Sequence, residues 1–304
     1  MLGTAYQSLI FQGPDIFFYY KGQPWIKYDG IEKLGNIMHD EKVGIFFSES
    51  FDYLNKLPRN NEFYDLLSYL AGYLCHYSLD RIAHPFIHYT AGIDTDHSRK
   101  TRKYHSYHRK LESTIDYFSL LKRGIAPNLF RSYDLIKIGN SNKPVLRNYY
   151  IYILNTIYGT RINERQADSA LTDICEVLKY LFDPTGLKFV LYRLIEIILG
   201  QKDEITSSMI PKRINGKFDY LNLSHRTWLH PCDSNKKSKV SFWGLYEGAL
   251  AEAGKFMDLV SSYTNRGELP DTFMQMIDNI SYSTGIECGN SRQLKYFDSI
   301  YERK

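Results

Sequence analysis

The amino-acid sequence predicts an all-α, multi-helix protein, and two observations lead to this fold class. Apolar residues recur at every third or fourth position over long stretches, which is the periodicity of a helix with one buried face. Runs that alternate between polar and apolar residues, which would indicate strands, are scarce. With 43% hydrophobic and 24% charged residues, the composition is that of a globular protein.

The 304 residues are enough for a complete hydrophobic core, and we expect a single helical domain over residues 1–304. The residues that carry chemistry lie within about 1–125, the metal-site half, and about 126–304 form a helical remainder. The 26 tyrosines are unusual, because a tyrosine-rich core must provide hydrogen-bond partners for many hydroxyl groups.

Near the N-terminus a Gly-Pro turn is followed directly by Asp15. An aspartate at this place is a good turn or helix-capping residue, which is the simpler interpretation. The alternative is that the turn presents the carboxylate to a metal site. Residues 31–54 then show helical periodicity and contain His39, a candidate metal ligand, beside Asp40, which we expect to be solvated.

The next helix is predicted from residue 66 to Pro85, which we expect to end it because proline removes a backbone hydrogen bond. His76, Asp80 and His84 follow one another at intervals of four residues, so they lie within about 80° of one another around the helix. Such polar groups on an apolar face need partners. A divalent metal is one explanation, and a simple hydrogen-bonded pair is the other.

A second pair with the same spacing, His108 and Glu112, lies in a predicted helix over 105–120. Two His-x3-acid pairs and the additional His84 indicate a site for more than one metal ion. Metal pairs are typical of phosphoester hydrolases. His105 precedes His108 by three residues, and the sequence does not decide between a ligand and a surface residue.

Most of the remaining chain is predicted to be helical, with a break at residues 183–186, where Asp-Pro-Thr-Gly occurs. Residues 201–240 are polar and basic and contain Trp228 between two histidines, which either line a pocket or pack the segment down. The predicted helices are 146–158, 164–182, 186–200, 241–263 and 269–282.

Charge and hydropathy limit the partners and the location. A net charge of +4 is too small to indicate a stable nucleic-acid partner, although it is compatible with anionic lipid or phosphate substrates. We expect no transmembrane helix, since no apolar stretch approaches 18 residues, and no signal peptide, and therefore a cytoplasmic location. Peripheral membrane contact stays open. We expect the four widely spaced cysteines to be reduced.

Several segments resemble the zinc-dependent phospholipase C family, which is helical and related to the P1-type zinc nucleases. They are QGPDIFFYY at 12–20, GNIMH at 35–39, YLAGYLCHYSLDRIAHP at 69–85 and HRKLESTID at 108–116. LNLSHRTWLHP followed by SFWGLYEGALAEA extends the resemblance to later parts of the chain. The order Asp, His, His-x3-Asp, His, His-x3-Glu is specific, because seven metal-binding residues recur in this order.

The resemblance implies two or three zinc ions. One zinc would be held by Asp15, His39, His76 and Asp80, and a second by His84, His108 and Glu112. Asp80 would bridge to a third zinc, whose remaining family ligands precede the aspartate at position 15 and have no counterpart here. We therefore expect either that the N-terminus is truncated or that the third site has been lost or rebuilt.

The leading hypothesis is a phospholipase C-like hydrolase in which a zinc-bound hydroxide attacks the phosphorus of a phosphodiester, with a phospholipid as substrate. Asp15 would hold zinc and also orient or deprotonate the nucleophile. One alternative is a nuclease or phosphomonoesterase on the same fold. The other is a zinc-stabilised helical protein without activity.

Overall fold

The computed structural model describes most of the chain and confirms the predicted all-α class. In this part of the chain, helices account for nearly all regular structure, and one two-stranded antiparallel sheet accompanies them. The described residues are 9–22, 29–94, 98, 101–139, 142–201, 203–266, 271–289 and 293–303. Residues 1–8 lie outside this range, so the prediction of a truncated N-terminus or of a lost or rebuilt third zinc site stays a prediction.

The chain divides into two compact units, and each is described here by itself. Unit 1 comprises Met1–Ile82, Ser132–Leu178 and Glu247–Asn290. Unit 2 comprises Ala83–Arg131, Lys179–Tyr246 and Ser291–Lys304. The single domain over 1–304 stays a prediction, because a division into compact units does not show whether either part folds alone.

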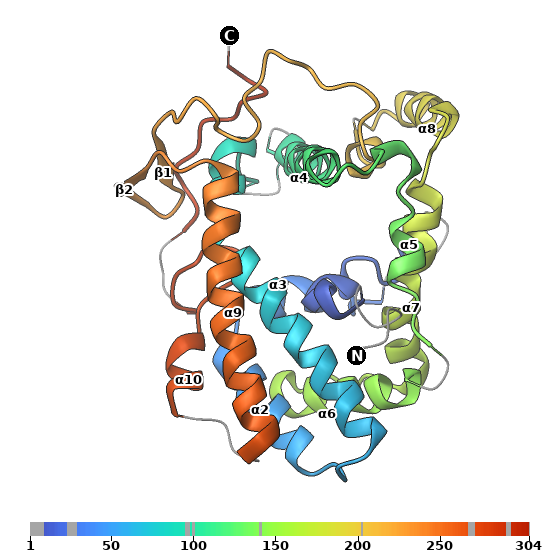
Figure 1. The fold of residues 1–304 in the computed structure, drawn as a ribbon. Coiled ribbons are helices and arrows are strands. Elements are labelled where there is room, and N and C mark those ends of the chain that lie inside the picture. The colour runs from blue at the N-terminus through green and yellow to red at the C-terminus, as the bar shows by residue number, and fades with distance from the viewer. Residues whose placement is uncertain are drawn as a thin grey trace. The chain divides into compact units, whose positions relative to one another are not determined.

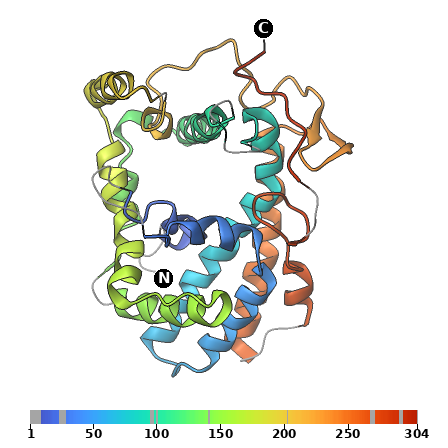
Figure 2. The ribbon, with the colours of Figure 1, turned by 180° about the vertical axis from the view of Figure 1, so that it is seen from behind.

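Unit 1 is a helical assembly around an aromatic core. Within it, α2 packs against α6 and α10 (Figures 1 and 2). Its elements are η1 (Leu9–Phe17), α1 (Lys33–Asp40), α2 (Val43–Asn55), α5 (Ser132–Leu135), α6 (Lys143–Tyr158) and α10 (Asp271–Ile277), with the larger parts of α3 (Asn61–Ala91), α7 (Glu164–Leu181) and α9 (Phe242–Arg266).

Several buried tyrosines of unit 1 have their hydroxyl groups in hydrogen-bonded pairs. The Tyr69 and Tyr150 hydroxyls are 2.6 Å apart, and those of Ser50 and Tyr149 are 2.7 Å apart. Both pairs lie inside the protein, so these hydrogen bonds offset the cost of removing the hydroxyls from water. Part of the tyrosine-rich composition therefore belongs to the core.

Unit 2 contains α4 (Lys103–Lys122), α8 (Leu187–Ile198) and a short hairpin of β1 (Trp228–His230) and β2 (Asp233–Ser238). Two 3-10 helices, η2 (Pro127–Leu129) and η3 (Thr206–Ser208), complete it. Both interpretations of the polar segment 201–240 hold in part. Trp228 packs the segment down, because its indole nitrogen donates to the Val240 carbonyl oxygen at 3.0 Å and its ring contacts Phe86. Residues of the stretch 218–223 line a pocket together with residues of α4.

Two predictions for the helices before residue 92 are wrong. α3 continues through Pro85 to Ala91. A proline inside a helix costs about 3 kcal/mol, but Ala83, Phe86 and Ile87 around it are buried, so tertiary packing outweighs the local penalty. Residues 31–54 form two helices, because Lys42 adopts a left-handed conformation with φ 57° between α1 and α2.

The other predicted helices, 146–158, 164–182, 186–200 and 241–263, correspond to α6, α7, α8 and α9 within a few residues. α10 ends earlier than predicted, at Ile277, where Asp278 has a φ of 45°. The four cysteines are free thiols. Among the described residues, no helix combines the length and the hydropathy needed to cross a bilayer.

Candidate metal centres

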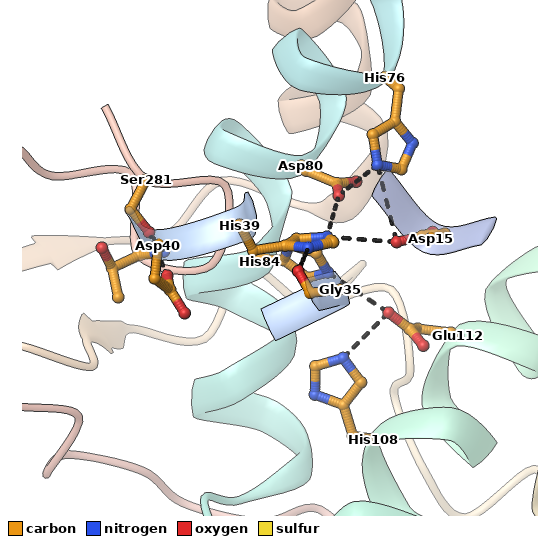
Figure 3. A network of polar contacts seen from close by, with 11 residues as sticks. Asp15, Gly35, His39, Asp40, His76, Asp80, His84, His108, Glu112 and Ser281 are labelled. Atoms are coloured by element: carbon orange, nitrogen blue, oxygen red, sulfur yellow. Dashed lines mark hydrogen bonds and ion pairs between the residues drawn. The ribbon is translucent and has the colours of Figure 1, made fainter. Parts of the chain in front are cut away.

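Unit 1 brings together four side chains that were predicted as ligands, from three separate elements. η1 supplies Asp15, α1 supplies His39, and α3 supplies His76 and Asp80. One donor atom from each lies within 4.8 Å of all the others, a group that can hold a metal ion. Figure 3 shows the imidazole of His39 between the carboxylates of Asp15 and Asp80, with His76 facing the same carboxylates.

The separations of the four donors fit tetrahedral zinc. Bonds of about 2.1 Å to nitrogen and oxygen place neighbouring ligands of a tetrahedral ion roughly 3.4 Å apart. His39 Nε2 lies 3.2 Å from Asp15 Oδ1 and 3.7 Å from Asp80 Oδ2. His76 Nε2 lies 2.9 Å from Asp80 Oδ2 and 3.9 Å from Asp15 Oδ1. These four of the six separations bracket the tetrahedral value, and the donor atoms all lie within 4.8 Å of one another, so an ion could draw the four side chains together.

The turn that carries Asp15 requires a glycine. Gly13 has φ 49° and ψ −135°, a backbone conformation that other residues avoid. A Cβ atom at this position would lie 2.3 Å from Cδ2 of His76. Only a residue without a side chain therefore allows η1 to approach α3 closely enough for Asp15 and His76 to share a site.

A backbone hydrogen bond fixes the orientation and tautomer of His39. Its Nδ1 lies 2.7 Å from the carbonyl oxygen of Gly35, one turn earlier on α1, and donates its proton there. Nε2 is then directed toward the two carboxylates and is the ring nitrogen that a metal ion can use. Metal-binding histidines typically hold their second ring nitrogen in this way, so the arrangement is that of a prepared ligand.

The electrostatics of this group favour a cation. Burial lowers the pKa of His39, but its hydrogen bonds to Asp15 and Asp80 outweigh burial and raise the pKa to about 10. Burial likewise lowers the pKa of His76, while the charges of Asp80 and Asp15 raise it above its ordinary value. Two carboxylates in a largely buried site thus attract positive charge, which either protons on the imidazoles or a divalent ion can supply.

Unit 2 contains the second predicted group, formed by His84 of α3 with His108 and Glu112 of α4. Glu112 Oε1 lies 3.0 Å from His108 Nε2 and 3.5 Å from His84 Nε2 (Figure 3). Desolvation raises the pKa of Glu112, but the two imidazoles outweigh it and hold the pKa below its usual range. Three protein donors leave room for water or substrate on a metal ion, which is typical of catalytic zinc sites.

His88 lies beside this second group, where its ring centroid is 5.0 Å from that of His108. Burial, together with the neighbouring His108 and His84, places the pKa of His88 well below its ordinary value. A neutral imidazole at this position adds no positive charge to a metal site.

Two other polar residues lie outside the groups. His105 Nε2 is 3.7 Å from a carboxylate oxygen of Asp94, and its side chain is more than half exposed. Asp40, expected to be solvated, is exposed and also accepts a hydrogen bond from the Ser281 hydroxyl at 2.7 Å.

Sequence reasoning missed the residues that position the ligands. Gly13 and Gly35 had a detectable signal, since each lies shortly before a predicted ligand within the quoted motifs, Gly13 two residues before Asp15 and Gly35 four residues before His39. Tyr282 had none. Its ring centroid lies 5.2 Å from that of His39 and 5.8 Å from that of His76, and its backbone N–H donates to the His39 carbonyl oxygen at 2.9 Å.

Comparison with known proteins agrees with this donor chemistry. A family model described as zinc dependent phospholipase C matches residues 13–169, which include every member of both groups. Among curated proteins and among solved structures, no match was found. Because the family model covers more than half of the 304 residues, the chain belongs to the zinc-dependent phospholipase C family.

Proposed function

We propose that this protein is a zinc-dependent phosphoester hydrolase that cleaves the phosphodiester of a phospholipid, with Asp15 and the six other predicted ligands as its site residues. The observation that carries the proposal is the four-donor group of unit 1, whose separations suit tetrahedral zinc and whose His39 is already oriented by Gly35.

In the proposed reaction, water adds to phosphorus, the bond to the leaving alkoxide breaks, and the alkoxide takes up a proton. Zinc, when bound, lowers the pKa of coordinated water to about 7 and neutralises phosphate oxygens. His39, His76 and Asp80 hold the ion, and their burial keeps competing water away from it. Asp15 is the most exposed of the four, so its carboxylate is placed to orient the attacking water and accept its proton.

The second group, His84, His108 and Glu112, is proposed to hold another zinc ion with an open coordination position. We therefore expect about two tightly bound zinc ions per chain. Elemental analysis of protein reconstituted with zinc and then dialysed measures this number. Fewer than one zinc per chain would contradict the proposal at its basis.

The catalytic test is Asp15→Asn, which removes the charge while retaining one oxygen. Loss of a general base typically lowers the rate by about 10²–10⁴, so hydrolysis of a chromogenic phosphodiester should fall by a factor in that range, and turnover should be harmed more than folding. Asp52→Asn is the matched control, since Asp52 is an exposed residue of α2 outside both groups. Equal activity of Asp15→Asn and the parent would limit Asp15 to a structural role in the turn.

A substrate panel separates the phospholipase from its alternatives. Zinc-loaded protein is assayed on micellar phosphatidylcholine, a single-stranded oligonucleotide and a chromogenic phosphate monoester. Faster cleavage of the phospholipid supports the proposal. Cleavage of only the oligonucleotide or the monoester would instead identify a nuclease or phosphomonoesterase, and bound zinc without any hydrolysis would identify a metal-stabilised protein.

A further inference from the structure

Helix α8 of unit 2 turns its apolar side chains to the solvent. An amphipathic helix of a globular protein normally buries this face. On α8, however, six large aliphatic side chains are more than half exposed, up to 81% at Ile198. They are Leu187, Val190, Leu191, Leu194, Ile197 and Ile198.

The face of α8 that turns inward carries charged groups beside the half-buried Phe189 and Tyr192, and specific hydrogen bonds hold it there. Glu196 has 0% exposure, and its Oε1 accepts from the backbone N–H groups of Ile205 at 2.6 Å and Thr206 at 2.9 Å. Its Oε2 accepts from the Thr206 hydroxyl at 2.8 Å. Arg193, on the same side, pairs with Asp203. These polar contacts therefore set the orientation of α8 and hold its apolar face toward the solvent.

These contacts connect α8 to the helix that carries part of the second metal group. Glu196 binds η3 through Thr206, and η3 packs against α4. There the Ser113 hydroxyl donates to the Ser207 carbonyl oxygen at 2.9 Å, and Arg109 Nε donates to the Ser207 hydroxyl at 3.2 Å. Since His108 and Glu112 lie on the same helix, a surface engaged by α8 is held in a defined position relative to the second group.

The charges near the start of α8 favour a phospholipid surface as the partner. Lys188 and Lys212 lie there: the Lys188 ammonium donates to the Lys179 carbonyl oxygen at 3.0 Å, and that of Lys212 donates to the Asp183 carbonyl oxygen. Arg213 follows and is exposed. The nearby acids are engaged inward, because Glu196 binds η3 and Asp183 accepts from backbone N–H groups of α8. Exposed aliphatic residues flanked by cations characterise helices that lie in a membrane interface.

We propose that α8 is a membrane-docking helix whose aliphatic face enters the interface of a phospholipid bilayer, with Lys188, Lys212 and Arg213 near the phosphates. This inference rests on the proposed function, because it assigns the surface by which the enzyme would reach a lipid substrate. Burial in lipid removes apolar side chains from water, which supplies the driving force for docking.

The test uses the full chain and vesicles of phosphatidylcholine, with and without phosphatidylserine, in a sedimentation assay. Val190→Gln combined with Leu194→Gln keeps the charge and the helical propensity but removes two central aliphatic side chains. We expect the affinity of this double variant for vesicles to be lower than that of the parent by a factor of about ten or more. The matched control is Ile45→Gln combined with Leu250→Gln, two helical positions of similar exposure, 52% and 49%, outside α8. It should bind like the parent.

A soluble chromogenic phosphodiester separates docking from chemistry. Both double variants should hydrolyse it at the parental rate, while only the α8 variant loses hydrolysis of vesicle lipid. A parent protein that does not bind vesicles, or an α8 variant that binds equally well, would overturn the docking proposal even if soluble substrate is cleaved. A parental dimer that the α8 variant converts to a monomer, with lipid binding unchanged, would overturn it in favour of a second copy of the chain. Vesicle binding without any phosphoester cleavage would leave docking supported and contradict the proposed reaction alone.

Discussion

Gly13→Ala should weaken zinc binding although residue 13 ligates nothing. The new Cβ would lie 2.3 Å from His76 Cδ2, whereas non-bonded carbon atoms prefer about 3.5 Å or more. The imidazole or the Asp15 turn must therefore move by roughly 1 Å, well beyond the ~0.2 Å that zinc–ligand distances tolerate. Disturbing a group that positions ligands typically lowers metal affinity about 10–100-fold, and we expect this loss here. Strain at φ 49° should also destabilise the metal-free protein by about 1–3 kcal/mol.

Gly159→Ala is the control that separates backbone strain from the contact with His76. Gly159 also has a positive φ, 65°, at the end of α6, but no atom lies within 4 Å of a Cβ built there. It should lower the unfolding free energy by about 1–2 kcal/mol and leave zinc affinity unchanged. Competition with a chromophoric chelator measures the affinity, and urea unfolding after metal removal measures the strain. Parental zinc affinity in Gly13→Ala, or an equal loss in both variants, would refute the reasoning.

Two further predictions concern stability. A strong chelator should lower the melting temperature, because the proposed ligands join η1, α1 and α3 and metal binding contributes to folding. In zinc-loaded protein, His76→Ala should lower the melting temperature, whereas His105→Ala, at an exposed position, should not. Equal effects of the two substitutions would argue against His76 as a ligand. Desolvation raises the pKa of Asp183, but hydrogen bonds from the backbone N–H groups of Phe189 and Gly186 outweigh it and lower the pKa below its ordinary value of 3.8. The ionised carboxylate therefore stabilises the folded protein above pH 3.8, and this contribution is lost as the pH falls further. Asp183→Asn removes a negative charge near the start of α8 and should therefore cost about 0.3–1 kcal/mol near neutral pH and progressively less below pH 3.8. Urea unfolding across this range measures the difference, and a difference that does not depend on pH would exclude the carboxylate charge as the cause.

The sequence by itself determined the helical class and the local geometry of the ligand pairs. A helix repeats every 3.6 residues, so His76 with Asp80, and His108 with Glu112, had to share a face once α3 and α4 formed. Their spacing, with Asp15 and His39 in the expected order, also carried the family resemblance. These features depend only on neighbouring residues, which is why they could be read from the chain.

Tertiary structure decided which local preferences hold and which distant residues meet. Pro85 remains inside α3 because the residues around it are buried, and packing is a sum over contacts that no local pattern contains. Asp15 meets His76 only because Gly13 permits a close approach between η1 and α3. Tyr282 contacts the same site although it lies some 200 residues later in the sequence. The periodicity of residues 186–200 predicted a helix but not which face is buried. That face was set by Glu196, whose carboxylate finds its hydrogen-bond donors on η3, and a periodic pattern cannot anticipate such partners.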